Sequence, residues 1–219
     1  MKRGANATNY CAKQSDSWII KSIFKYRDLL MSSRAWNEFL QTDTYRTKQI
    51  YLELRGDRGL VSWRNILRGN LASSKALFFL WMACQNRLHT KDRLSKFGTV
   101  TDGVCLYCNE TETCAHLFLA CRETRDFWLQ VLNWSHNPHS PQAWTEKLIW
   151  ITTTARGKSN RAKLLRICVA EVIYHIWIVQ NNRVFKNARM EQLNLHWVLD
   201  RIKYRAKLDR KLGVYVDTL

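Results

Sequence analysis

Three cysteines and one histidine stand close together near the middle of the chain, in the order Cys105-x2-Cys108-x7-His116-x4-Cys121. Zinc in structural sites takes four ligands in a tetrahedron, and thiolate sulfur and imidazole nitrogen are among its usual donors. The x2 gap lets two thiolates of one tight turn point the same way. The x4 gap is interpreted as one or two helical turns, on which positions i and i+5 still lie within about 140° of each other. The spacing therefore predicts that these four residues bind one structural zinc ion.

The remaining cysteines fit this interpretation. Cys114 is the nearest competing ligand, because it precedes His116 by two residues, whereas Cys84 and Cys168 stand in apolar stretches typical of buried small hydrophobic residues. The chain opens without an apolar signal segment and has no apolar run of about 20 residues, so we expect an intracellular protein of nucleus or cytoplasm, not a membrane protein. Thiols stay reduced there, which favours metal binding over disulfides.

Few turn-forming residues and long apolar stretches favour helices, since the chain has 8 glycines and 2 prolines among 219 residues. We expect a mainly α protein, in which a helical domain with a zinc-stapled loop is followed by long basic helices. Its expected parts are an N-terminal helical segment at 1–60, a zinc-binding domain at 61–134 and a basic helical region at 141–219. The polar stretch 135–141 is the expected linker, and residues 48–55 fit a short strand or a helix end.

Apolar periodicity indicates where the core lies. Residues 73–87 are expected to form a helix that is buried on most sides and capped by Ser73 or Ser74, and residues 159–185 a second apolar helix. Residues 115–134 show helical spacing throughout. Several tryptophans stand among aliphatic residues at helical spacing, so we interpret them as core rather than as base-stacking groups. They are Trp63, Trp81, Trp128, Trp150 and Trp177.

The chain is strongly basic, with 35 lysines and arginines against 18 acidic residues and a net charge of +17. Nucleic acid is the commonest partner that neutralises such a surplus, ahead of an acidic membrane surface. About half of the surplus lies in residues 158–211, where Tyr204 offers a stacking ring beside basic residues. A solvated helix face is the alternative interpretation of that run. The candidate nucleic-acid contacts are Arg87, Arg93, Arg183, Lys186, Arg201, Lys203 and Arg205.

Residues 61–128 resemble the zinc-binding domain that follows the polymerase in non-LTR (LINE-type) retrotransposon reverse transcriptases, chiefly those of plants. The matching stretches are VSWRNIL, KALFFLWMACQNRLHTKDRLSKFG, CLYCNETETCAHLFLAC and the RDFW that follows. The resemblance implies the same four zinc ligands and a role beside a template nucleic acid. IWIVQNNRVF at 176–185 is similar to a Trp-rich basic helix found downstream in these elements.

The catalytic residues of a polymerase are not apparent in the sequence. We find no Tyr-x-Asp-Asp motif, no paired carboxylates in a strand-turn-strand, no Gly-rich phosphate loop and no nucleophile elbow. We therefore expect no enzyme and no small-molecule substrate, but a nucleic-acid-binding module derived from a retrotransposon. A zinc-stabilised protein-interaction domain, or a retroelement fragment without a selected role, is the alternative.

Overall fold

The described part of the protein is mostly helical, as the sequence predicts. The computed structural model describes residues 11, 13–42, 47–56, 59–99, 102–139, 143–186 and 192–219. Within those residues the only extended pairing is an isolated antiparallel bridge between Val104 and Thr111. The chain divides into two compact units, residues 1–60 and residues 61–219. No helix in the described ranges is long and apolar enough to cross a membrane.

The first unit contains α1 (Trp18–Met31), α2 (Arg34–Thr42) and α3 (Thr47–Arg55). Residues 48–55 are therefore helical, which excludes the short strand. The carboxylate of Glu53 in α3 accepts hydrogen bonds from the backbone N–H groups of Arg34 and Ala35 and from the Ser33 hydroxyl. It thereby satisfies donors that the first turn of α2 leaves free. The two N–H bonds hold the pKa of Glu53 below its usual value.

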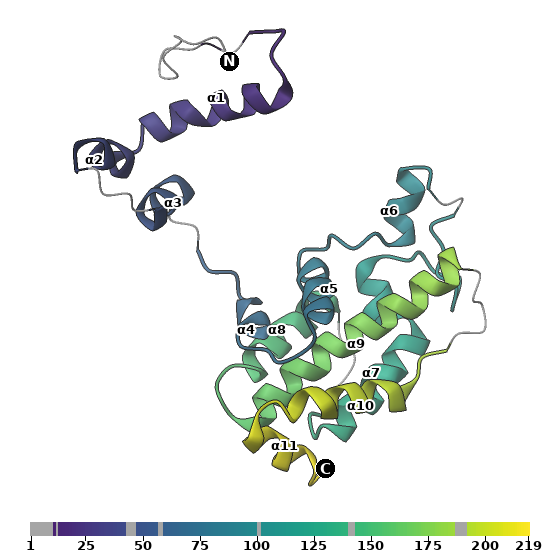
Figure 1. Cartoon of the computed structure of the whole chain (residues 1–219). Helices are drawn as coiled ribbons and strands as arrows, with labels where there is room; N and C mark the ends of the chain where they lie inside the picture. The colour runs from purple at the N-terminus through teal and green to yellow at the C-terminus, as the bar shows by residue number, and fades with distance from the viewer. Residues whose placement is uncertain are drawn as a thin grey trace. The chain divides into compact units, whose positions relative to one another are not determined.

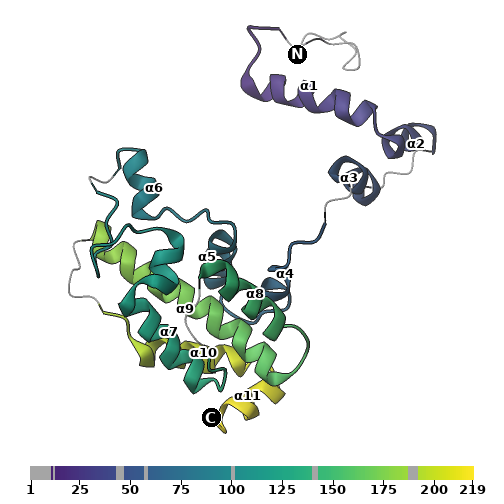
Figure 2. The same ribbon diagram turned by 180° about the vertical axis from the view of Figure 1, so that it is seen from behind.

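The second unit is built around one long helix. Its elements are α4 (Arg64–Leu67), α5 (Ser74–Cys84), α6 (Lys91–Lys96), a π-helical turn (His116–Ala120), α7 (Arg122–Trp134), α8 (Trp144–Thr154), α9 (Asn160–Phe185), α10 (Leu195–Ala206) and α11 (Arg210–Val216). In Figure 1, α9 crosses the unit with α5, α7 and α10 around it. Figure 2, in which the molecule is seen from behind, shows α8 beside α9. Residues 164–177 of α9 are buried all round, so α9 is the core of the unit.

The expected division between residues 61–134 and 141–219 falls inside this core. Helices from both sides of it, α5 and α7 before and α8 to α11 after, contribute to one hydrophobic cluster. Of the expected linker at 135–141, residues 140 and 141 lie outside the described residues, and Ser135 and Asn137 are buried. Asn137 donates to the Ser135 carbonyl oxygen at 2.7 Å and accepts from Arg161 of α9 at 2.9 Å. These polar residues pack because their hydrogen bonds are satisfied within the fold.

The apolar side chains follow the sequence expectation in part. Trp128 and Trp177 are buried, Trp63 and Trp150 pack against the core from its edge, and Trp81 is half-buried beside Phe78. Ser73 caps α5 as expected, because its hydroxyl accepts from the Ala76 N–H. However, α5 is not buried on most sides, since Phe78 is 53% exposed. The helix that is enclosed all round is α9.

A neutral histidine joins α9 to α10. The Nε2 atom of His175 accepts the backbone N–H of Asn194 at 2.9 Å, and its ring lies against Phe127 and Trp197. Burial lowers the pKa of His175 to about 4, and the positive charge of Arg201 adds to this effect. Protonation would add a buried charge and remove the acceptor of that hydrogen bond.

His175 therefore makes stability depend on pH. As the pH is lowered from 6.5 to 4, the unfolded chain takes up a proton at His175 that the folded chain does not. The free energy of unfolding therefore decreases as the pH decreases. We expect about 2 kcal/mol of this loss to disappear in His175→Gln. Denaturant titrations across that pH range measure the free energy of unfolding of both proteins. Subtracting one from the other removes the contribution of groups that titrate in both. His196→Gln, at an exposed position of α10, is the control. Parallel curves for wild type and His175→Gln would contradict the assignment.

Candidate metal centre

The four residues of the cysteine–histidine motif come together in the structure. One ligand atom from each of Cys105, Cys108, His116 and Cys121 lies within 4.8 Å of all the others. The Cys108 sulfur is 3.2 Å from Nε2 of His116. Zinc bonds of about 2.3 Å to sulfur and about 2.0–2.1 Å to nitrogen put tetrahedral ligand atoms about 3.6–3.8 Å apart. The cluster therefore fits one tetrahedral zinc with small adjustments of the side chains.

The first two ligands lie on a short hairpin. The bridge between Val104 and Thr111 closes it, and the Cys105 N–H donates to the carbonyl oxygen of Glu110 at 2.7 Å. Asn109 takes a positive φ of 61° at the turn, which asparagine tolerates better than most residues. The backbone N–H of Tyr107 points at the Cys105 sulfur, 3.4 Å away. This turn brings both sulfurs to one side and gives one of them an N–H donor that stabilises a thiolate.

Of the last two ligands, His116 begins a π-helical turn and Cys121 follows it, instead of the regular α-helix expected for residues 115–134. The N–H of Cys121 donates to the carbonyl oxygen of His116 at 2.9 Å, five residues back. Cys121 itself is extended, with ψ of 131°, and α7 begins after it. A regular helix would turn these two side chains about 140° apart. The wider turn and the extended residue bring both to one site.

The sulfur of Cys121 lies where α7 begins. The pKa of Cys121 is lowered, first by a hydrogen bond from the Cys105 thiol and also by the backbone N–H groups of Thr124 and Glu123. The hydrogen bond to Cys121 and burial raise the pKa of Cys105. Zinc binds thiolates, so an ion at this site would displace the thiol proton of Cys105. The donor set thus suits zinc chemically as well as geometrically.

The other cysteines of the second unit, Cys84, Cys114 and Cys168, lie apart from the cluster. Cys114, the competing ligand, is buried, and its sulfur lies 4.0 Å from the carbonyl oxygen of Ala83 within the hydrophobic core. Burial raises the pKa of Cys114 to about 12, as it also does for Cys84 and Cys168. Among the described cysteines, the structure thus places only the three predicted ones at the centre.

A buried carboxylate attaches the segment that carries the four ligands, residues 102–121 (the zinc loop), to the rest of the unit. Glu112 accepts the N–H of Lys91 at 3.0 Å and a hydrogen bond from the Gln180 amide of α9. Lys91 also forms an ion pair with Asp102 at the start of the loop. Burial raises the pKa of Glu112 to about 7. Sequence reasoning did not assign Glu112 this role, although Glu112 belongs to the quoted CLYCNETETCAHLFLAC stretch.

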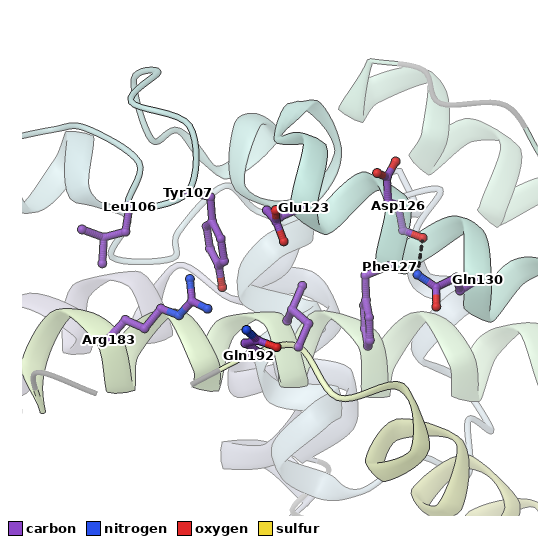
Figure 3. A pocket seen from close by; sticks show the side chains of 9 residues that line it. Leu106, Tyr107, Glu123, Asp126, Phe127, Gln130, Arg183 and Gln192 are labelled. Carbon is purple, nitrogen blue, oxygen red and sulfur yellow. Dashed lines mark hydrogen bonds between the residues drawn. The ribbon is translucent and has the colours of Figure 1, made fainter. Parts of the chain in front are cut away.

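A pocket of about 450 Å³ lies beside the zinc loop, between the loop, α7 and the end of α9 (Figure 3). The guanidinium of Arg183 stands 4.3 Å from the ring centre of Tyr107, so α9 also supports the loop by a cation–π contact. Two carboxylates, Glu123 and Asp126, line the pocket. They outnumber the single guanidinium of Arg183 in the lining, so the pocket carries a net negative charge that disfavours phosphate.

The seven candidate nucleic-acid contacts lie on different elements. Arg87, Lys186 and Lys203 are exposed, and Arg93 donates to the carbonyl oxygen of Asn86. Arg183 contacts the zinc loop. The structure places the last two candidates at the contact between α10 and the segment before α5. They are Arg201 and Arg205, which both donate hydrogen bonds to that segment.

Comparison with known proteins agrees with this centre. Residues 45–128 match the family model described as zinc-binding in reverse transcriptase. All four cluster residues lie within the matched segment. No curated protein and no solved structure matches the chain. The resemblance to a reverse-transcriptase zinc-binding domain is therefore confirmed for residues 45–128.

Proposed function

We propose that the chain is a non-catalytic, nucleic-acid-binding zinc module derived from a plant-type non-LTR retrotransposon. The charge of the second unit carries the proposal. Residues 61–219 contain 24 lysines and arginines against 12 aspartates and glutamates, a surplus of 12. A folded unit with this surplus attracts a polyanion. Residues 45–128 also match a zinc-binding domain of reverse transcriptase, an enzyme that copies nucleic acid.

The acidic side chains of the second unit do little to screen that charge from a ligand. Several are already paired within the fold, and each such pair uses one acid and one base. The paired acids are Asp102, Asp126, Glu171, Asp209 and Asp217. The surplus therefore remains on other side chains, such as the exposed Arg68, Lys75 and Lys158. Lysine and arginine at the surface bind phosphate and release condensed counterions.

The zinc site supports a structural role rather than catalysis. Catalytic zinc keeps one coordination position open for water or substrate, whereas four protein ligands fill the tetrahedron. The ligands also join segments with little core of their own, since Val104 and Leu106 in the hairpin are 36% and 46% exposed. One zinc ion would hold the hairpin against the start of α7.

Binding to labelled single- and double-stranded RNA and DNA tests the proposal. We expect binding at 50 mM salt that weakens linearly on a log–log plot as salt rises, because each phosphate contact releases a counterion. With about six contacts, the affinity should fall about 1000-fold between 50 and 200 mM salt. An acidic polypeptide of equal charge is the control competitor. Absence of binding at low salt, or equal competition by the polypeptide, would contradict nucleic-acid recognition.

One observation favours the alternative, a zinc-stabilised protein-interaction domain. The first unit exposes large apolar side chains, among them Trp18 at 79%, Ile19 at 62% and Tyr26 at 59%. Exposed apolar patches mark surfaces that bind proteins. If this alternative holds, the chain should fail to bind nucleic acid while Trp18→Ser reduces association measured by analytical ultracentrifugation. If neither binding nor association is found, the chain is better explained as a fragment without a selected role.

A further inference from the structure

A second pocket, of about 460 Å³, lies between α10 and the segment before α5, well away in sequence from the zinc ligands. Its lining differs in character from the pocket beside the zinc loop, because it combines two guanidinium groups with two aromatic rings. The lining residues are Ser73, Trp197, Asp200, Arg201, Tyr204 and Arg205.

The two arginines of this pocket are held in place by the fold. Arg205 donates from Nε to the carbonyl oxygen of Leu71 at 2.6 Å and from Nη2 to that of Ala72 at 3.1 Å. Arg201 donates to Glu171 at 2.9 Å and to the Ser73 hydroxyl at 3.1 Å. A guanidinium has five N–H groups. Each arginine thus keeps three N–H groups without a hydrogen-bond partner in the described segments.

The charges of the two arginines are balanced differently. Glu171 neutralises Arg201, whereas the two partners of Arg205 are uncharged carbonyl groups. Arg205 therefore presents a full positive charge at a fixed position. A guanidinium held in this way loses little conformational entropy when it binds a phosphate, for which its planar N–H groups are well shaped.

The two aromatic rings also differ. The Trp197 ring already lies 4.6 Å from the His175 ring and 4.7 Å from the Arg201 guanidinium, so it is engaged within the protein. Tyr204 is 70% exposed and makes no ring contact in the ranges that the structure describes. Its ring is therefore the one that a base can stack on.

The helical order of these residues separates two ends of the pocket. At about 100° per residue, Asp200 and Tyr204 lie on one side of Trp197, and Arg201 and Arg205 lie on the other. A carboxylate repels phosphate but accepts hydrogen bonds from the amino and imino groups of a base. The phosphate end is therefore at Arg205, and the base end is at Tyr204 and Asp200.

We infer that this pocket binds one nucleotide of a single-stranded RNA or DNA, with its phosphate against Arg205 and its base stacked on Tyr204. The inference rests on the proposed function and assigns it a site. A base inside a duplex cannot stack on a side chain, because its faces are covered by neighbouring base pairs. The pocket therefore selects single strands, while the charge of the rest of the unit serves both kinds of nucleic acid.

Tyr204→Ala in the full chain tests the site by fluorescence anisotropy with a labelled single strand and a duplex of the same sequence. Loss of one stacked base should weaken single-strand binding about 5- to 150-fold and leave duplex binding unchanged. Tyr204→Phe keeps the ring and should bind like wild type within about twofold. Tyr51→Ala removes a tyrosine that is 61% exposed on the first unit and should change nothing.

The possible outcomes distinguish failure of the proposed nucleotide site from failure of the proposed function. If wild type binds single strands and Tyr204→Ala binds them equally well, the site is wrong although the function stands. An equal loss for single strands and duplexes would also overturn the site, since a stacking residue does not act on duplexes. If wild type binds neither, the proposed function fails, and the site fails with it.

Discussion

Replacing Cys108 by serine is expected to lower the zinc content below one ion per chain and to lower the melting temperature in the same protein. Structural zinc contributes an apparent 10–16 kcal/mol, so a site that loses one of its thiolates loses much of what holds residues 102–121 in place. Cys108 is exposed, and serine has nearly its size. The effect therefore comes from the metal rather than from packing. Metal analysis and thermal unfolding followed by circular dichroism measure both quantities.

Cys114→Ala is the matched control, because Cys114 lies in the same segment but points into the core. It should keep one zinc per chain, with only the modest loss of stability that a small core truncation causes. A chelator should lower the melting temperature of wild type and of Cys114→Ala and have little further effect on Cys108→Ser. Full zinc content in Cys108→Ser, or loss of zinc in Cys114→Ala, would show that the ligand set is wrong.

Glu171→Ala is expected to destabilise the second unit by about 3 kcal/mol. Glu171 is fully buried in α9 and accepts hydrogen bonds from the Ser73 N–H and from Arg201, so it joins α9 to both α5 and α10. Its removal leaves the part-buried Ser73 N–H without a partner and the half-buried Arg201 guanidinium without its counter-charge. Losing one member of a buried pair costs about 3–5 kcal/mol. We take the lower end because the Arg201 side chain is 33% exposed. Denaturant unfolding measures the loss.

A double-mutant cycle distinguishes the contribution of the Glu171–Arg201 ion pair from that of helix α9 itself. Glu171→Met with Arg201→Met replaces both partners by apolar groups, which should recover most of the loss, since apolar substitutes for a whole buried pair are often neutral. Glu123→Ala, at an exposed position of α7, should stay within about 0.5 kcal/mol of wild type. A loss for Glu171→Ala no larger than this control would refute the role of the buried pair.

The metal ligands could be predicted from the sequence because their spacing is a local property. Zinc chemistry restricts the donors, and the C-x2-C turn places two of them within a few residues. The backbone conformation between the last two ligands, His116 and Cys121, could not be predicted. Residues 115–134 have helical spacing throughout, and nothing in that pattern shows that the chain makes a π-helical turn and restarts at Cys121. The interruption brings His116 and Cys121 to one site, which a regular helix would not do.

Roles that depend on distant segments were also not predictable. Arg201 and Arg205 stand in a basic run, and charge alone makes them equal candidates for phosphate. In the fold both reach the segment before α5, more than a hundred residues earlier, and only Arg205 keeps an unbalanced charge. The expected linker at 135–141 shows the same limit at Asn137. It is buried and accepts a hydrogen bond from Arg161 of α9, a partner that no local pattern reveals.

X-ray absorption at the zinc edge of the purified protein tests the central claim most directly. Coordination by Cys105, Cys108, His116 and Cys121 predicts three sulfur atoms at about 2.3 Å and one nitrogen at about 2.0–2.1 Å, with no further ligand. That result would establish a closed site suited to stabilising a loop. Fewer than three sulfurs together with an added oxygen would contradict it, because the metal would then have lost a thiolate and opened to water.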